Sequence, residues 1–216
     1  MGCWVMGREF LHVFEEWADS YDETVTGSDK EYEEVFRHYE EILDEVALRS
    51  EGHVLEFGAG TGNLTAKLLE KGRSVTAIEP SEQMREIAKQ KHSHATFLDG
   101  DFMQFPIPER VDSIVSTYAF HHLTDEEKEV AVKVYGKLLS NGGKIIFADT
   151  MFENEEVYGQ TIEKAVKDGH HRLAEDLRTE YYSTIPYFTA IFEENGFFIT
   201  FKRCNAFVWM IEAIKL

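Results

Sequence analysis

One stretch decides how this chain folds, and it reads Val54-Leu55-Glu56-Phe57-Gly58-Ala59-Gly60-Thr61-Gly62-Asn63-Leu64. It begins as a short apolar run, continues through three glycines at alternate positions and ends as the opening of a helix. A strand, a glycine turn and a helix in this order place backbone N–H groups and the positive end of the helix beside a ligand. Glycine suits the turn because it bends sharply and leaves no Cβ between the backbone and that ligand.

A second strand-like run, residues 74–78, ends in Glu79, twenty-one positions after Gly58. An acid at the tip of the second strand is placed to accept hydrogen bonds from the diol of a ribose. The glycine turn and this acid together predict one bound cofactor that contains a nucleoside.

Strand and helix patterns alternate from residue 52 onward, with strands expected at 53–57, 74–79, 95–98, 111–116 and 144–149. Ser81 is the expected N-cap of the helix after the second strand, and Thr124 with Glu127 forms a capping box for a later helix. Two final extended runs, 197–202 and 206–214, are too close for a helical crossover and should pair antiparallel. The pattern predicts an α/β, doubly wound, Rossmann-like sheet of seven strands, mostly parallel, with helices on both faces.

We expect a single domain over residues 1–216. Its expected parts are an N-terminal helical cap at 9–50, a cofactor-binding core at 52–150, a helical insertion after the fifth strand at 151–184 that caps the substrate, and a final helix and β-hairpin at 185–216. Ser28 and Glu31 form a capping box for a helix that should run to about Ser50. The sequence leaves two possibilities open for its start: residues 1–5 belong to the natural protein, or the natural protein starts at Met6.

Composition restricts the partners. The net charge of −18 repels phosphate backbones, so we expect no nucleic-acid substrate. No apolar run is long enough to span a membrane, so we expect no membrane as a partner. Two cysteines are too few for a disulfide framework or a four-thiolate metal site, which favours a cytoplasmic location. We expect a monomer or a homodimer.

The glycine turn also separates cofactor classes. A dinucleotide fingerprint needs Gly or Ala at position 63, where this chain has Asn, and no Gly-Lys-Ser/Thr follows as in a P-loop. The run Glu56-Phe57-Gly58-Ala59-Gly60-Thr61-Gly62 instead resembles the first motif, E/D-x-G-x-G-x-G, of class I S-adenosylmethionine-dependent methyltransferases. The resemblance covers residues 9–214 and includes Glu79, Gly100-Asp101-Phe102, Ala119-Phe120-His121-His122-Leu123 and the closing hairpin. The start, from Trp17-Ala18 to Tyr21-Asp22, is similar to the YrrT-like methyltransferases of Bacillus.

The resemblance implies how S-adenosyl-L-methionine would be bound at its methionine end. Gly58 and Gly60 would let the backbone approach that end, and Glu56 would reach the ammonium directly or through water. An acid at a strand end with no ligand is the alternative for Glu56.

At the nucleoside end, the resemblance implies that Glu79 takes both ribose hydroxyls, an arrangement that is strong and geometrically specific for an anion. Asp101 would accept from the adenine amino group while Phe102 covers the ring. The alternatives are a solvated strand-end acid for Glu79 and a plain turn aspartate for Asp101, since Asp-Gly-Asp favours turns.

Two residues are candidates for catalysis. Tyr21 would face the sulfonium with its electron-rich ring, although Tyr21 and Trp17 equally fit a packing role. His122 matches the His-Leu that commonly follows the fourth strand in this family and would act as general base, whereas the alternative places His121 and His122 as polar residues of a lid. The spacing of the remaining histidines predicts no metal site, which leaves His92, His94, His170 and His171 at the surface or rim.

The expected activity is methyl transfer from the sulfonium to a small molecule, in line, with orientation supplying much of the rate. The Pro-Pro-aromatic tetrad of amino-directed DNA methyltransferases and the aspartate cluster of metal-dependent catechol-type enzymes are both missing. Two alternatives stay open: another group transferase on the same fold, such as an aminopropyl transferase, and a non-catalytic sensor of S-adenosylmethionine or S-adenosylhomocysteine.

Overall fold

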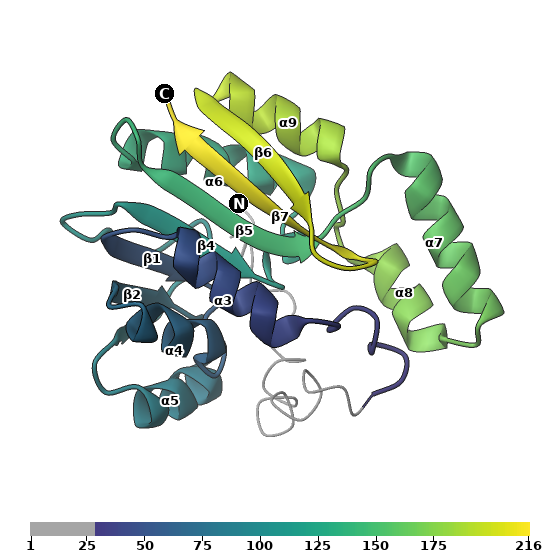
Figure 1. The fold of residues 1–216 in the computed structure, drawn as a ribbon, viewed down its shortest axis with the longest axis horizontal. Helices are drawn as coiled ribbons and strands as arrows, with labels where there is room; N and C mark the ends of the chain where they lie inside the picture. Colours follow the sequence, from purple (N-terminus) through teal and green to yellow (C-terminus); the bar gives the residue numbers. More distant parts are fainter. Residues whose placement is uncertain (1–28) are drawn as a thin grey trace, which may run out of the picture.

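A seven-stranded sheet forms the centre of the molecule, with strand order β3-β2-β1-β4-β5-β7-β6 (Figure 1). The structure is a computed structural model and describes residues 29–216. Neighbouring strands from β3 to β5 are parallel, and β7 runs antiparallel to both β5 and β6, which confirms the predicted fold class. The strands are β1 His53–Phe57, β2 Ser74–Ile78, β3 Thr96–Leu98, β4 Ser113–Thr117, β5 Lys144–Thr150, β6 Phe197–Arg203 and β7 Val208–Lys215.

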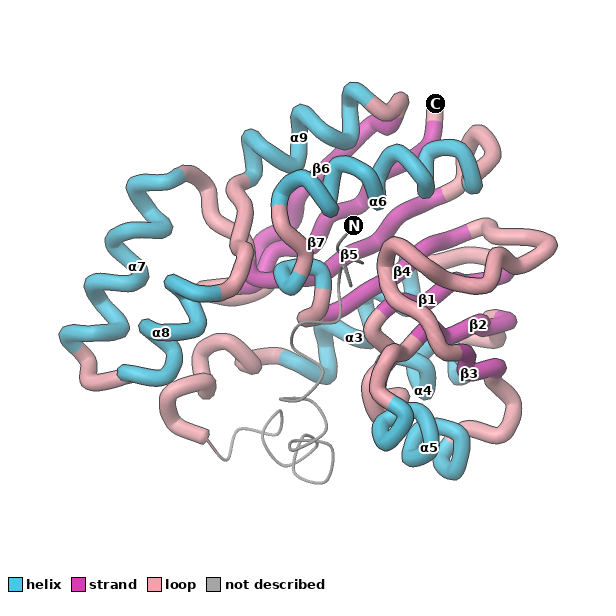
Figure 2. Tube along the Cα trace, turned by 180° about the vertical axis from the view of Figure 1, so that it is seen from behind, coloured by secondary structure: helices cyan, strands magenta, loops and turns pink. Residues whose placement is uncertain are grey.

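Helices cover both faces of the sheet, as Figures 1 and 2 show from opposite sides. The helices are α3 Tyr39–Arg49, α4 Asn63–Glu70, α5 Glu82–Lys91, α6 Asp125–Leu138, α7 Glu155–Lys167, α8 His171–Thr179 and α9 Ile185–Glu194, with a short 3-10 helix η2 at Phe120–His122. Successive residues of β5 point to opposite faces of the sheet and pack in different hydrophobic clusters. Ile146 lies in the cluster that contains residues of α3 and α4, and Phe147 lies in the cluster that contains residues of α6 and α9. This period of two is what a strand buried on both faces requires.

Two predicted helix starts are confirmed at the level of single hydrogen bonds. The Ser81 side chain accepts from the Met84 N–H as the N-cap of α5. Thr124 and Glu127 form a complete capping box at the start of α6, in which each side chain accepts from the backbone of the other residue. Polar side chains therefore satisfy the first N–H groups of both helices.

The helix expected from Ser28 to about Ser50 is wrong in its first half. Turns occupy the described residues before Tyr39, and α3 begins only there. The cause is His38, which has a φ of 64°, a left-handed conformation that a continuous helix excludes. Ser28 lies outside the described residues, and so does Tyr21.

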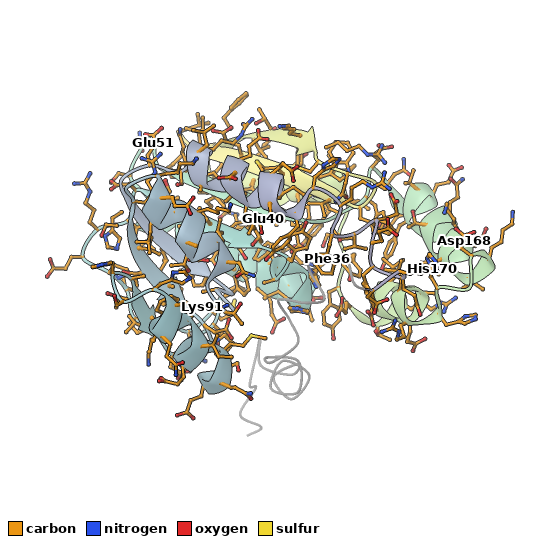
Figure 3. All side chains as sticks on the ribbon, turned by 60° about the horizontal axis from the view of Figure 1, so that its bottom comes forward. Phe36, Glu40, Glu51, Lys91, Asp168 and His170 are labelled. Atoms are coloured by element: carbon orange, nitrogen blue, oxygen red, sulfur yellow. The ribbon has the colours of Figure 1, made fainter. Side chains whose placement is uncertain are left out.

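Residues 151–184 form a pair of helices, α7 and α8, beyond the end of the sheet. Asp168 and His170 lie at the turn between these helices, on the outlying part of the molecule (Figure 3). The bridge between Phe152 and Thr184 joins the beginning of this segment to its end. Within residues 29–216, we find no helix with the length and apolar content that crossing a membrane requires.

Candidate functional site

The glycine turn after β1 lies where the order of the strands reverses. From β1 the chain proceeds outward to β2 and β3, and from β4 it proceeds the other way to β5. In open α/β sheets the crevice at the carboxyl ends of the strands at such a point is the usual place for a ligand. The predicted cofactor residues after β1, β2 and β3 all follow carboxyl ends of neighbouring parallel strands.

Glycine is required in this turn for two different reasons. Gly58 has a φ of 63°, and a Cβ added there would lie 2.6 Å from the Cβ of Ala119, so the backbone passes closely over the segment after β4. Gly60 has a φ of 56°, but an added Cβ would meet only the Met84 sulfur at 3.9 Å. Its requirement is therefore conformational, and the space beside it is open.

Glu79 connects the ends of the first two strands. Its Oε2 accepts a 2.8 Å hydrogen bond from the Gly60 N–H, and its Oε1 accepts one of the same length from the Ser81 N–H. The side chain is almost fully buried, and burial raises the pKa of its carboxyl above the usual value. The structure thus brings together the glycine turn and the acid that the sequence analysis assigns to opposite ends of one cofactor.

Glu56 is a buried acid beneath the same turn. Its Oε2 accepts a 2.6 Å hydrogen bond from the Thr65 hydroxyl of α4, and the residue is 1% exposed. Burial raises the pKa of Glu56 to about 8, and the nearby charge of Glu79 adds to the effect. A cationic partner would stabilise the ionised form of this buried carboxyl, because its charge offsets the cost of burying the carboxylate.

Asp101 follows β3, beside the strand that leads to Glu79. Its Oδ1 accepts from the N–H groups of Met103 and Gln104 at 2.8 and 2.7 Å, so this oxygen stabilises the turn that the sequence analysis names as an alternative role. Phe102 is buried and stacks on Phe57 with ring centroids 5.2 Å apart. The ring of Phe102 therefore lies in the core beneath the glycine turn.

A hollow opens beside the glycine turn, and its lining fits the methionine end of the cofactor that the resemblance implies, whereas Glu79, Asp101 and Phe102 are not among the lining residues. Glu56 offers a buried anionic partner for an ammonium, and the turn presents a surface that carries no Cβ at its glycines. Sequence analysis missed Tyr39 and Thr117, which also line the hollow. The lining residues are Tyr39, Glu56, Gly58, Ala59, Gly60, Thr61, Asn63, Leu64 and Thr117.

His121 and His122 lie on η2, just after β4. The Nδ1–H of His121 donates to Asp149 Oδ1 at 2.6 Å, and the backbone N–H of His121 donates to Asp149 Oδ2 at 3.0 Å. His121 Nε2 lies 3.4 Å from Glu180 Oε2, and His122 Nδ1 lies 3.9 Å from Glu180 Oε1. The insertion thus supplies an acid to the histidine pair.

The two adjacent imidazoles have opposite pKa shifts. Burial disfavours the charged form of His121, but the carboxylates of Asp149 and Glu180 outweigh burial and raise the pKa of His121 above its ordinary value. Burial and then the charge of His121 hold the pKa of His122 well below its ordinary value. His122 is therefore neutral at pH 7 and presents a lone pair.

Sequence analysis missed the acids of this cluster. Asp149 is the last residue of the predicted fifth strand, and its position at a carboxyl strand end was the available signal. Glu180 and Tyr182 gave no signal, because their contact with His121 depends on how the insertion folds back. Of the remaining histidines, His94 and His171 are exposed, as expected.

Comparison of the sequence with known proteins gives a consistent result. A family model described as a methyltransferase domain matches residues 54–143. An uncharacterized methyltransferase of Bacillus cytotoxicus is 57% identical over 211 residues, which cover 97% of this chain and 100% of the relative. An uncharacterized methyltransferase of Bacillus mycoides is 56% identical over the same shares.

Solved structures share the fold at low sequence identity. Magnesium protoporphyrin IX methyltransferase from Synechocystis, with bound S-adenosylhomocysteine, superposes with a TM-score of 0.70 at 17% identity, covering 95% of this chain and 99% of that one. A possible histamine N-methyltransferase from Thermotoga maritima gives a TM-score of 0.68 at 18% identity and covers 96% of this chain and 100% of that one. At these identities the likeness concerns the fold alone.

Proposed function

Because the chain belongs to the class I S-adenosylmethionine-dependent methyltransferases, we propose that it methylates a small molecule by in-line transfer from the sulfonium of S-adenosyl-L-methionine. The observation that carries the proposal is the hollow lined by Glu56 and the glycine turn, in which the Gly60 N–H is bonded to the Glu79 carboxylate. A small acceptor fits the acidic chain better than a nucleic acid, since the net charge is −18.

In this proposal, the methionine end of the cofactor lies against the turn at Gly58 and Gly60, and Glu56 receives its ammonium. The raised pKa of Glu56 supports this assignment, because an ammonium stabilises the carboxylate that burial disfavours. Binding therefore converts a costly buried acid into a satisfied ion pair.

The nucleoside end lies over the next two strands. Glu79 accepts from the ribose hydroxyls with the lone pairs that its two backbone donors leave available, since a carboxylate offers about four acceptor sites. Asp101 accepts from the adenine amino group. The neighbouring positions of β2 and β3 support this order, because the Glu79 N–H donates to Leu98 O at 3.1 Å.

In this proposal the acceptor lies at the histidine pair, and the role of Tyr21, which lies outside the described residues, stays the one that the resemblance implies. The cofactor supplies an electrophilic methyl group when bound. A lone pair of the acceptor forms the new bond to the methyl carbon as the carbon–sulfur bond breaks, the electron pair of that bond stays on sulfur, and the acceptor loses its proton. His122 contacts the reactive group of the acceptor, since a neutral imidazole offers a lone pair to a proton or to a metal ion.

Product formation tests the activity. The purified protein is incubated with S-adenosylmethionine and separate pools of amines, thiols, hydroxyl compounds and carboxylates, and S-adenosylhomocysteine is quantified. We expect turnover with at least one pool and none with a DNA or RNA pool. Tight cofactor binding with no turnover in any pool would contradict catalysis and favour a sensor.

A further inference from the structure

Within residues 29–216, two imidazoles and one carboxylate form a cluster at the short helix η2. The three groups are His121, His122 and Glu180, and one ligand atom from each lies within 4.8 Å of the other two. Ligands about 2.0–2.1 Å from a tetrahedral Zn²⁺ stand roughly 3.3–3.5 Å from one another. The closest pair, His121 Nε2 and Glu180 Oε2, is already 3.4 Å apart.

We propose that His121 Nε2, His122 Nδ1 and a Glu180 oxygen bind one divalent transition-metal ion, with Zn²⁺ as the ion that this donor set favours. Two histidines and one glutamate, with a further position open, form a ligand set of catalytic zinc sites. The sequence analysis expects no metal site, because Glu180 lies 58 positions after His122 and no ligand spacing connects them.

Asp149 supplies the outer support that a metal-bound histidine needs. It accepts from the Nδ1–H of His121 at 2.6 Å, which leaves Nε2, the ring nitrogen nearest Glu180, as the atom that gives up its proton when an ion binds. Metal-binding histidines characteristically donate their other ring N–H to a carboxylate in this way. The backbone N–H of His121 donates to the same side chain, so the ring is held from two positions.

The loop that carries Glu180 is fixed onto the same helix. The Tyr181 N–H donates to the His121 carbonyl oxygen at 3.0 Å. The Tyr182 hydroxyl donates to Glu180, and its ring stacks on the His121 ring with centroids 5.0 Å apart. The buried Lys128 of α6 donates to the Tyr181 carbonyl and to the Ser183 hydroxyl. A site held in this way needs little rearrangement to bind an ion.

Charge and access also suit a cation with an open position. Among residues 29–216, His121 interacts electrostatically with the acids Asp149, Glu180 and Asp176 and with the cation Lys128. The side chains of His121, His122 and Glu180 are 11%, 14% and 18% exposed, so the group borders solvent.

The metal site deepens the proposed function and rests on it for its role: with the ion bound, His122 acts on the acceptor through the metal and not by contacting its proton. An acceptor hydroxyl or thiol would bind at the open position, where the metal lowers its pKa and the proton passes to solvent. The acceptor then attacks the methyl carbon as an alkoxide-like or thiolate donor. This places the acceptor in the class of hydroxyl and thiol compounds.

Metal titration of the full-length protein, freed of any affinity tag, tests the site. Isothermal titration with Zn²⁺ should show one equivalent of the ion bound per chain. Titration with Co²⁺, followed by its visible absorption, should show the same stoichiometry and the spectrum of a four-coordinate Co²⁺ ion. Glu180→Gln and His122→Ala should each lose this binding, and Asp149→Asn should weaken it about 10–100-fold. The double variant His94→Ala/His171→Ala, which removes two exposed histidines, should bind like the wild type.

Two results would overturn the site: no stoichiometric binding of Zn²⁺ or Co²⁺ by the wild type, or unchanged binding in both Glu180→Gln and His122→Ala. The first result would leave His121 as an imidazolium paired with two carboxylates. S-adenosylhomocysteine affinity is measured on every variant to establish that it is folded. Because metal binding is read without methyl transfer, a failed metal site and a failed methyltransferase give different results.

Discussion

The backbone N–H of Gly60 donates a hydrogen bond of 2.8 Å to the carboxylate of Glu79. This bond joins the turn after β1 to the end of β2, so the two ends of the expected cofactor site form one rigid unit. A carboxylate held by two backbone donors keeps its remaining lone pairs in a fixed direction. The ribose recognition that we propose depends on this preorganisation.

Replacing Glu79 tests the ribose contact. We expect Glu79→Ala to weaken binding of S-adenosylhomocysteine by about 1.5–3 kcal/mol, the range for hydrogen bonds to a charged group. Calorimetry measures the affinity, and urea unfolding checks that the variant is folded, since Gly60 and Ser81 lose an acceptor. Glu82→Ala, an exposed acid three residues later, is the matched control and should bind normally. Equal affinities of the two variants would show that the ribose is held elsewhere.

Alanine substitutions at Gly58 and Gly72 distinguish the cost of backbone strain from the cost of a steric clash. Both have positive φ, 63° and 73°, but an added Cβ meets Ala119 at 2.6 Å only at Gly58. Gly72→Ala should therefore cost about 1–2 kcal/mol of unfolding free energy from the left-handed conformation alone, and Gly58→Ala should cost more. Urea unfolding measures both values. Adding Ala119→Gly to Gly58→Ala should recover part of the loss, and no recovery would contradict the contact.

The raised pKa of Glu56 predicts that the stability of the cofactor-free protein depends on pH. Its pKa rises from 4.5 in the unfolded chain to about 8 in the folded protein, because burial disfavours the carboxylate. A raised pKa contributes stability that is complete below the unfolded value and is lost as pH rises through the folded value. Between pH 4.5 and 8, Glu56 should therefore lower the unfolding free energy by up to ~1.4 kcal/mol per pH unit.

Urea unfolding of the wild type and of Glu56→Gln, at intervals between pH 5 and 8, isolates this contribution. The amide stays neutral, so the stability of Glu56→Gln should fall less with rising pH. Parallel curves for the two proteins would mean that Glu56 does not titrate in this window.

His122 should matter for turnover more than for cofactor binding. His122→Ala should reduce kcat about 10²–10⁴-fold, because the acceptor's proton is no longer assisted, and should leave S-adenosylhomocysteine affinity nearly intact. Kinetics with the best acceptor and calorimetry provide the two measurements, with His171→Ala on the exposed start of α8 as control. Normal turnover in His122→Ala would remove His122 from the reaction.

The sequence predicted those parts of the fold that local chemistry decides. The cap at Ser81 and the capping box at Thr124 need only side chains within three residues, and both formed as expected. The helix before residue 39 failed because its apolar spacing gives no sign of the left-handed backbone at His38. A pattern of side chains does not report a single unusual φ.

The candidate site divides in the same way. Glu56, Gly60 and Glu79 were found because each stands at a fixed place relative to a strand end. The meeting of His121 with Glu180 was not found, because they lie 59 positions apart in the sequence and only the folded insertion brings them together. Sequence reasoning identified the histidine pair but not the acids that determine its charge.

Calorimetric titration of the wild-type protein with S-adenosylmethionine and S-adenosylhomocysteine tests the central claim most directly, namely that the hollow at Gly60, whose N–H is bonded to Glu79, binds S-adenosylmethionine and its product. We predict one equivalent of each ligand bound per chain, with the affinity lowered in Glu79→Ala. Absence of binding of either ligand at millimolar concentration, in protein that unfolds cooperatively, would contradict the account.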